Sequence, residues 1–278
     1  MLLKTNGDIP IDSIKINFDT EGLWILNIAL AVIMFGVALS IKIDDFKLLI
    51  KKPKILLVGV FSQFFLLPAL TFVAILIIKP HPSFALGMMM IAACPGGNIS
   101  NFFSKMAKGN SALSVSLTAF ATVICLLMTP LNLQFYSGLY EPTNEIIKTV
   151  QLDPIELFKL VLLILGIPIV LGMLLNHYFE EISKKIEVLL KPFSMIVFLA
   201  LIVIAFYDNI DVFLNYIHLV AGLVIFHNIG AYCIGFYTAK IFGLEKRDRK
   251  TISMETGIQN GGLGLLLIFQ FFDGLGGM

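Results

Sequence analysis

Residues 93–101, with the sequence ACPGGNISN, interrupt an otherwise apolar run of the chain. Proline lacks an amide donor and clashes with the preceding helical turn, and paired glycines lower the cost of non-helical backbone. Residues 254–262, METGIQNGG, interrupt a second apolar run with three glycines and several polar side chains. Such stretches are either packing kinks or breaks that free backbone groups for binding, and the amide and hydroxyl groups in both favour the second interpretation.

The composition of the chain is that of a membrane protein. Of its 278 residues, 58% are hydrophobic and only 14% are charged. A soluble domain carries about 25% charged residues because its surface faces water. The sequence therefore predicts an all-α polytopic membrane protein surrounded by a lipid bilayer. Its net charge of +1 argues against a nucleic-acid partner.

A helix needs roughly 20 apolar residues to cross the hydrocarbon core of a bilayer. About eight spans are predicted, at 22–42, 54–78, 84–104, 109–134, 156–176, 191–207, 216–240 and 251–273. The span at 191–207 is the shortest, and the connection at 135–155 is long. Residues 1–21 form a polar segment without the features of a signal peptide, and residues 22–278 form a single transmembrane unit.

The basic residues predict the orientation of the spans. Fifteen of the 20 lie in or beside alternate connections, within 42–54, 105–108, 184–191 and 240–250. Cytoplasmic loops carry an excess of lysine and arginine. This pattern predicts a multi-pass protein of the cell membrane with its amino terminus outside.

The two interrupted spans are five spans apart, so they enter the membrane from opposite sides. That arrangement is typical of inverted-topology repeats in secondary transporters. If each repeat has five helices and the fourth is broken, one further span is expected after Met278. The sequence thus predicts an inverted-repeat transporter whose final span is missing.

Glu255 is the one carboxylate predicted deep inside a span. A charge at the bilayer centre costs about 2.5–3.5 kcal/mol on insertion scales, and such residues usually face a partner or a cavity. No lysine or arginine lies at a matching depth. A small cation is the natural partner, and sodium, like other hard cations, prefers oxygen ligands.

Several other oxygen-bearing residues are predicted to lie near Glu255. Ser114 and Thr118 are four residues apart and share one helix face. Each hydroxyl alone could instead bond to the carbonyl one turn back, so a shared role rests on Glu255 having no other counter-charge. The remaining candidates are Gln63, Ser100 and Asn101, together with Thr256, Ile258 and Gln259 beside the second interruption.

Two other polar residues, His227 and Asn228, lie within the seventh span. They could line a pathway, but a histidine bonded to a backbone carbonyl is the simpler expectation.

An intramembrane enzyme would need a nucleophile–base pair or a carboxylate dyad at depth. Glu255 has no acidic mate, so the sequence does not predict an enzyme.

The two interruptions resemble the crossover motifs of the bile acid:sodium symporter family. Residues 93–101 with 107–114 (AKGNSALS) resemble the first motif, and residues 255–260 (ETGIQN) the second. The likeness covers most of the chain from about Leu23 onward. It implies two broken helices that cross in a core domain, formed by 54–134 and 216–273, with the remainder in a panel-like domain.

The same resemblance implies two sodium ions behind the crossover. One site would use Ser100, Asn101, Ser114, Thr118 and Glu255, and the other Gln63, Glu255, Thr256, Ile258 and Gln259. Asn98 and Asn260 would face the substrate, a small organic anion such as a bile acid or a pantothenate-like acid. The implied function is sodium-coupled symport by alternating access. A proton-coupled or uncoupled carrier, and a membrane receptor that does not transport, remain alternatives.

Overall fold

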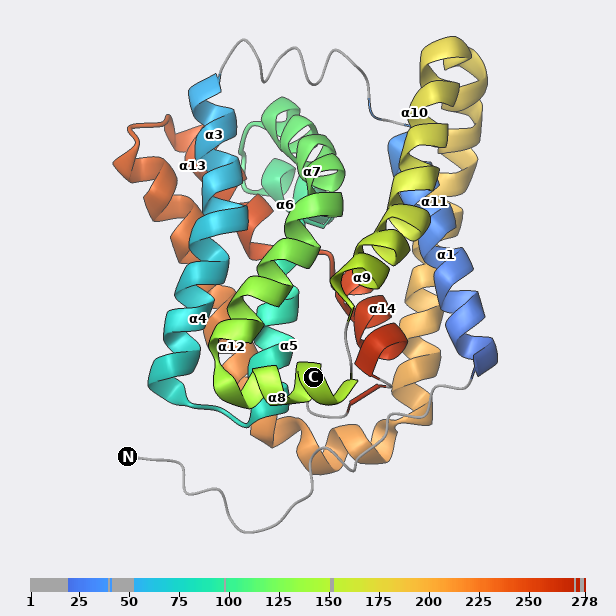
Figure 1. Cartoon of the computed structure of the whole chain (residues 1–278). Coiled ribbons are helices and arrows are strands. Elements are labelled where there is room, and N and C mark those ends of the chain that lie inside the picture. The colour runs from blue at the N-terminus through green and yellow to red at the C-terminus, as the bar shows by residue number, and fades with distance from the viewer. Residues whose placement is uncertain are drawn as a thin grey trace.

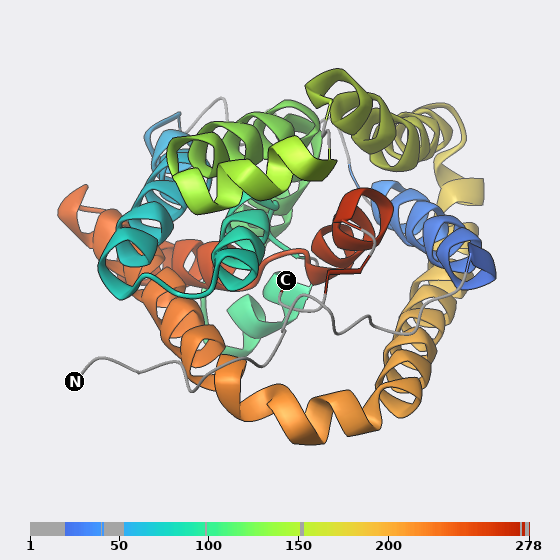
Figure 2. The same cartoon turned by 60° about the horizontal axis from the view of Figure 1, so that its bottom comes forward.

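The computed structural model describes residues 20–39, 41, 53–97, 99–150, 153–272, 274, 275 and 278, and every regular element in them is a helix. Figures 1 and 2 show two groups of helices with α14 (Gly261–Phe272) between them, in contact with α1 and α5. The larger group contains α3 (Pro53–Phe61), η2 (Ser62–Leu66), α4 (Leu67–Ile78), α5 (Pro82–Ala93), α6 (Ile99–Met106), α7 (Ser111–Leu139), α8 (Glu141–Val150), α12 (Ile210–Ile241) and α13 (Lys246–Gly257). The smaller group contains α1 (Thr20–Ala38), α9 (Pro154–Val161), η3 (Leu162–Gly166), α10 (Ile167–Tyr178) and α11 (Glu180–Asp208).

Four continuous helical stretches are long and apolar enough to cross a membrane: Pro53–Ile78, Ser111–Leu139, Ile155–Tyr178 and Ile210–Ile241. Shorter apolar helices cover Asn27–Ala38, Pro82–Ala93 and Gly261–Phe272. The protein is therefore an all-α membrane protein.

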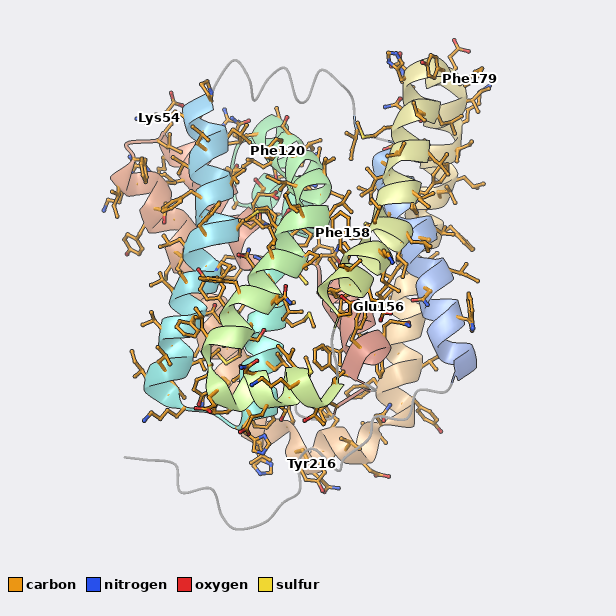
Figure 3. The ribbon with its side chains drawn as sticks, in the orientation of Figure 1. Lys54, Phe120, Glu156, Phe158, Phe179 and Tyr216 are labelled. Atoms are coloured by element: carbon orange, nitrogen blue, oxygen red, sulfur yellow. The ribbon has the colours of Figure 1, made fainter. Side chains whose placement is uncertain are left out.

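The helices reverse direction at two opposite ends of the molecule. The connections α6–α7, α10–α11 and α12–α13 lie at the upper end of Figure 1, and α4–α5, α7–α8 and α11–α12 at the lower end. In Figure 3, Lys54 and Phe179 mark the upper end and Tyr216 on α12 marks the lower end.

Helix α11 is longer than the sequence predicts. The apolar run at 191–207 was expected to be the shortest span, but the helix begins at Glu180 and contains 29 residues. Its first turns are charged, with Lys184 Nζ lying 3.1 Å from Glu180 Oε1 one turn before it. Pairs at this spacing stabilise exposed helix, whereas hydropathy detects only the apolar part.

The long connection predicted at 135–155 is also largely helical. Helix α7 continues to Leu139, and α8 follows after one residue. Thr143 and Ile147 are the buried side chains of α8, which packs on α5 and α7. The Thr143 hydroxyl donates to the Ser137 carbonyl at 2.7 Å and so holds α8 against the end of α7.

Pro68 explains the π-helical segment η2. Proline has no amide hydrogen for the carbonyl four residues earlier, which belongs to Phe64. The Leu67 backbone amide instead donates to the Ser62 carbonyl, five residues earlier. The side-chain Nδ2 of Asn132 on α7 donates to the Phe64 carbonyl at 2.8 Å. Since a bilayer offers no water to a freed carbonyl, this side chain replaces the missing donor. Pro168 follows η3 in the same way.

The end of α1 is closed by side chains from α10 and α11. Asn176 Nδ2 donates to the Ile41 carbonyl at 2.9 Å, and the Ser183 hydroxyl donates to the Leu39 carbonyl at 3.1 Å. Both side chains are buried. These bonds satisfy carbonyl groups that the helix itself cannot use, and they join the three helices of the smaller group.

Replacing Asn176 with alanine is expected to destabilise the protein by about 1–3 kcal/mol, because a buried carbonyl loses its donor. Thermal unfolding in detergent measures the change. Leu171→Ala, at an exposed position of the same helix, is the control and should unfold near the wild-type temperature. An unchanged unfolding temperature for Asn176→Ala would show that the bond does not stabilise the helix end.

Candidate functional site

The two interrupted stretches pair with each other at the centre of the larger group. Helix α5 ends before the first stretch and α6 begins after it, while α13 and α14 flank the second. The Gly97 backbone amide donates to the Ile258 carbonyl at 2.7 Å, and the Asn260 backbone amide donates to the Pro95 carbonyl at 2.8 Å. Backbone groups that a continuous helix would use internally are thus used across the crossing.

Gly96 allows the two stretches to approach closely. It lies opposite Gln259 in an antiparallel bridge. A Cβ atom at position 96 would lie 2.9 Å from the Glu255 carbonyl oxygen and 3.0 Å from Gln63 Nε2. Any larger residue would displace the backbone that carries Glu255, so this position requires glycine.

Side chains from neighbouring segments satisfy the broken helix ends. The Thr129 hydroxyl of α7 donates to the Ala93 carbonyl at 2.8 Å, where α5 ends. Asn228 Nδ2 of α12 donates to the Gly257 carbonyl at 3.0 Å, where α13 ends. Asn260 Oδ1 accepts from the amide three residues on, at 3.1 Å, and caps α14.

The Glu255 side chain of α13 is buried beside this crossing, with 2% of its surface exposed. Its Oε1 atom accepts hydrogen bonds from the hydroxyls of Ser100, at 2.6 Å, and Ser114, at 2.5 Å. Its Oε2 atom accepts one from the Thr118 hydroxyl at 2.8 Å. Ser100 comes from α6 and the other two from one face of α7, so three helices converge on one carboxylate.

The negative charge of Glu255 has no basic partner among the described residues. Hydrogen bonds to a charged group contribute about 1.5–3 kcal/mol each, so the three hydroxyls stabilise the carboxylate. Hydroxyl groups carry no net charge, however, and leave the site one unit negative. A site of this kind, lined by oxygen atoms, suits a small hard cation.

The predicted members of the first cation site lie together. Asn101 Oδ1 is 3.4 Å from the Thr118 hydroxyl, at the edge of the group around Glu255. The remaining members, Ser100 and Ser114, contact the carboxylate directly. This set therefore offers side-chain oxygens from α6, α7 and α13 in one place.

Two predicted members of the second cation site, Gln63 and Gln259, contact the backbone carbonyls of Glu255 and Thr256. Gln63 is buried in η2, and its Nε2 donates to the Glu255 carbonyl at 3.4 Å. Gln259 Nε2 donates to the Thr256 carbonyl at 2.6 Å. Gln259 Oε1 is buried without a hydrogen-bond partner, so one oxygen of this set is left for a ligand. The Ile258 carbonyl accepts one bond from the crossing backbone, and a carbonyl oxygen has a second lone pair.

Of the two asparagines predicted to face the substrate, Asn98 lies outside the described residues. Asn260 lies at the crossing, where its backbone amide takes part in the pairing and its Oδ1 caps α14.

Sequence reasoning missed some residues of this region. Ser62 is fully buried, and its hydroxyl lies 3.1 Å from that of Thr256. Its position beside Gln63, six residues before Pro68, is the signal that could have identified it. The expectation for His227 was wrong, because its Nε2 lies 2.8 Å from the Thr71 hydroxyl rather than on a backbone carbonyl. Two side chains on neighbouring helices form this contact, which sequence spacing does not reveal.

Comparison with known proteins identifies relatives across most of the chain. The family model for the sodium bile acid symporter family matches residues 27–216. An uncharacterized sodium-dependent transporter of Bacillus subtilis is 31% identical over 90% of this chain and 75% of its own length. The ileal sodium/bile acid cotransporter of Homo sapiens is 30% identical over 85% of this chain and 66% of its own length.

A probable chloroplastic sodium/metabolite cotransporter of Arabidopsis thaliana is 28% identical over 88% of this chain. This chain spans only 59% of that plant relative and 66% of the human one. Because the family model matches more than half of the residues, and the Bacillus relative aligns with nearly all of them, the chain belongs to the sodium bile acid symporter family.

Proposed function

We propose that this protein is a symporter that couples the uptake of a small organic anion to the movement of sodium. The observation that carries the proposal is the buried Glu255 carboxylate, which is surrounded by hydroxyl oxygens and paired with no described basic residue. The relatives named as sodium-dependent transporters and cotransporters support sodium as the coupling ion.

The first sodium ion would bind among Ser100, Asn101, Ser114, Thr118 and Glu255. Each hydroxyl has two lone pairs and a proton that can rotate, so its oxygen can turn towards a cation. The ion would neutralise Glu255 and hold α6 and α7 against α13.

The second sodium ion would bind among Gln63, Glu255, Thr256, Ile258 and Gln259. The unpartnered Gln259 Oε1 supports this assignment, since a buried polar oxygen without a donor is rare in folded proteins. An ion at this position would order the backbone of the second interruption.

The substrate would bind at the crossing, beside Asn98 and Asn260. Helices α6 and α14 both begin immediately after the paired backbone stretches. The amino end of a helix carries a partial positive charge, so a carboxylate-bearing substrate is favoured there. Sodium binding would arrange these helix ends first and the substrate would follow.

Transport would occur by alternating access in a cell-membrane protein with eight spans in this chain and its amino terminus outside. The two helix groups support a division into a core, 54–134 and 216–273, and a panel-like remainder that move against each other. Two sodium ions with a monoanion carry net positive charge, which the membrane potential drives at about 2.3 kcal/mol per charge per 100 mV. The two interruptions form backbone hydrogen bonds with each other, which supports two broken helices that cross, as an inverted repeat would have.

Replacing Glu255 with glutamine is expected to abolish sodium binding, because the charge that attracts the ion is lost. Thermal stabilisation of the purified protein by sodium chloride, relative to choline chloride at fixed pH, measures binding. A ligand at 100 times its Kd stabilises by about 2.7 kcal/mol per site, which is readily detected. Uptake of taurocholate and of pantothenate into proteoliposomes, with sodium or choline, tests transport with the same variants.

Glu156→Gln is the matched control for that experiment. Glu156 is exposed on α9, in the smaller helix group, where Figure 3 labels it. This variant should respond to sodium like the wild type. Sodium stabilisation that survives in Glu255→Gln would refute the assignment, and uptake independent of sodium would favour a proton-coupled or uncoupled carrier. Binding of either anion without counterflow would favour a receptor.

Replacing Gln259 with leucine is expected to remove the second sodium site and leave the first. The Hill coefficient for sodium should then fall from about two towards one, since it cannot exceed the number of coupled sites. Gln270→Leu, at an exposed position of α14, is the control. A sodium curve of unchanged steepness in Gln259→Leu would remove Gln259 from the ion site.

A further inference from the structure

A second layer of polar contacts joins the same three helices one turn above the Glu255 site. The Thr251 hydroxyl of α13 lies 3.0 Å from the Ser104 hydroxyl of α6 and accepts from the Asn110 backbone amide at 2.8 Å. Asn110 Nδ2 donates to Asp248 Oδ1 at 2.9 Å. Ser104 and Thr251 are fully buried and Asp248 is nearly so. We refer to these four residues as the upper polar cluster.

The upper polar cluster repeats the Glu255 site at a spacing of four residues. Four residues is about one turn of an α-helix, so positions at this spacing share one face. The matching pairs are Ser100 and Ser104 on α6, Asn110 and Ser114 at the start of α7, and Thr251 and Glu255 on α13. The two layers are therefore stacked, and one layer cannot shift without affecting the other.

The turn between α6 and α7 is shaped to meet α13. Lys108 has a positive φ of 56°, and a Cβ atom at Gly109 would lie 2.7 Å from the Thr251 hydroxyl oxygen. Glycine is thus required for the turn to come this close. Lys250 Nζ donates to the Ala107 carbonyl at 2.7 Å from the other side of the turn.

Asn110 links the start of α7 to α13 through both ends of its side chain. Its Oδ1 accepts from the Leu113 amide at 3.2 Å and caps α7, while its Nδ2 donates to Asp248. The amino end of α7 therefore has a fixed position relative to α13. Ser114 and Thr118, which contact Glu255, follow on the same helix.

This cluster is unsuited to bind a cation itself. The side-chain amide of Asn110 donates to the carboxylate of the cluster, Asp248, and two cationic side chains reach the adjoining turn. Lys250 bonds to Ala107, and Arg247 bonds to the Gly109 carbonyl at 3.4 Å. The arrangement instead favours a structural link between the turn and the ion site below it.

We propose that Ser104, Asn110, Asp248 and Thr251 are positioning residues that set the sodium affinity of the Glu255 site. They fix the register of α6 and α7 against α13, and so the distance from the Glu255 carboxylate to the hydroxyls of that site. The inference rests on the proposed sodium function. Groups that orient metal ligands without touching the metal typically change its affinity about 10- to 100-fold when they are replaced.

Thr251→Val tests the proposal, because valine keeps the shape of threonine and removes its hydroxyl. The half-saturating sodium concentration, measured by thermal stabilisation of the full chain against choline, should rise about tenfold or more. Thr251→Ser restores a hydroxyl and should return it near the wild-type value. If Thr251→Val does not fold, Ser104→Ala removes a single member of the cluster and should raise the same concentration.

Ser253→Ala is the matched control on α13. The Ser253 hydroxyl donates to the Tyr232 carbonyl at 2.8 Å, towards α12 and outside both layers. The half-saturating sodium concentration of the Ser253→Ala variant should equal that of the wild type. The unfolding temperature in choline records any general loss of stability separately.

The outcomes separate the two proposals. A wild-type protein that sodium does not stabilise would overturn the proposed function. A wild type that responds to sodium, with unchanged sodium affinity in Thr251→Val or Ser104→Ala, would overturn the positioning role alone. A Ser253→Ala variant that loses as much affinity as Thr251→Val would also overturn it, because the effect would then be general to α13.

Discussion

The convergence of three hydroxyl groups on the buried Glu255 carboxylate is the constraint on which the rest of the site depends. Ser100 reaches it from α6, and Ser114 and Thr118 reach it from α7. These contacts require α6 to begin close to α13, which in turn requires the break between α5 and α6. The contacts to a single charged side chain are therefore linked to the interruption between α5 and α6.

A break in a membrane helix is costly unless every freed backbone group finds a partner. Here the two interruptions bond to each other, with Gly97 and Asn260 donating across the crossing. Thr129, Asn228 and the cap by Asn260 satisfy the helix ends. The polar residues that surround the crossing thus stabilise an irregular backbone, and they leave Gln259 Oε1 as a buried oxygen without a donor.

The sequence predicts those parts of the structure that depend on local pattern. Proline and glycine located the first interruption and glycine located the second, and the spacing of Ser114 and Thr118 put them on one face. Long-range partners could not be predicted: the bond from Asn132 to Phe64 that accompanies η2, and that from Thr71 to His227, join separate helices. The hydropathy pattern also predicted no helix at the charged start of α11. Hydropathy identifies apolar segments, whereas charged residues can form a helix outside the apolar run. For the same reason the eighth span was predicted to begin at residue 251, although α13 begins at Lys246 and includes Asp248 of the upper polar cluster.

An experimental structure solved in saturating sodium chloride, and again in choline chloride, tests the central claim most directly. The account predicts ion density against the Glu255 carboxylate and the oxygens of Ser100 and Ser114 in sodium only. An identical site in both salts, with the hydroxyls still donating to Glu255 and no ion beside either interruption, would contradict it.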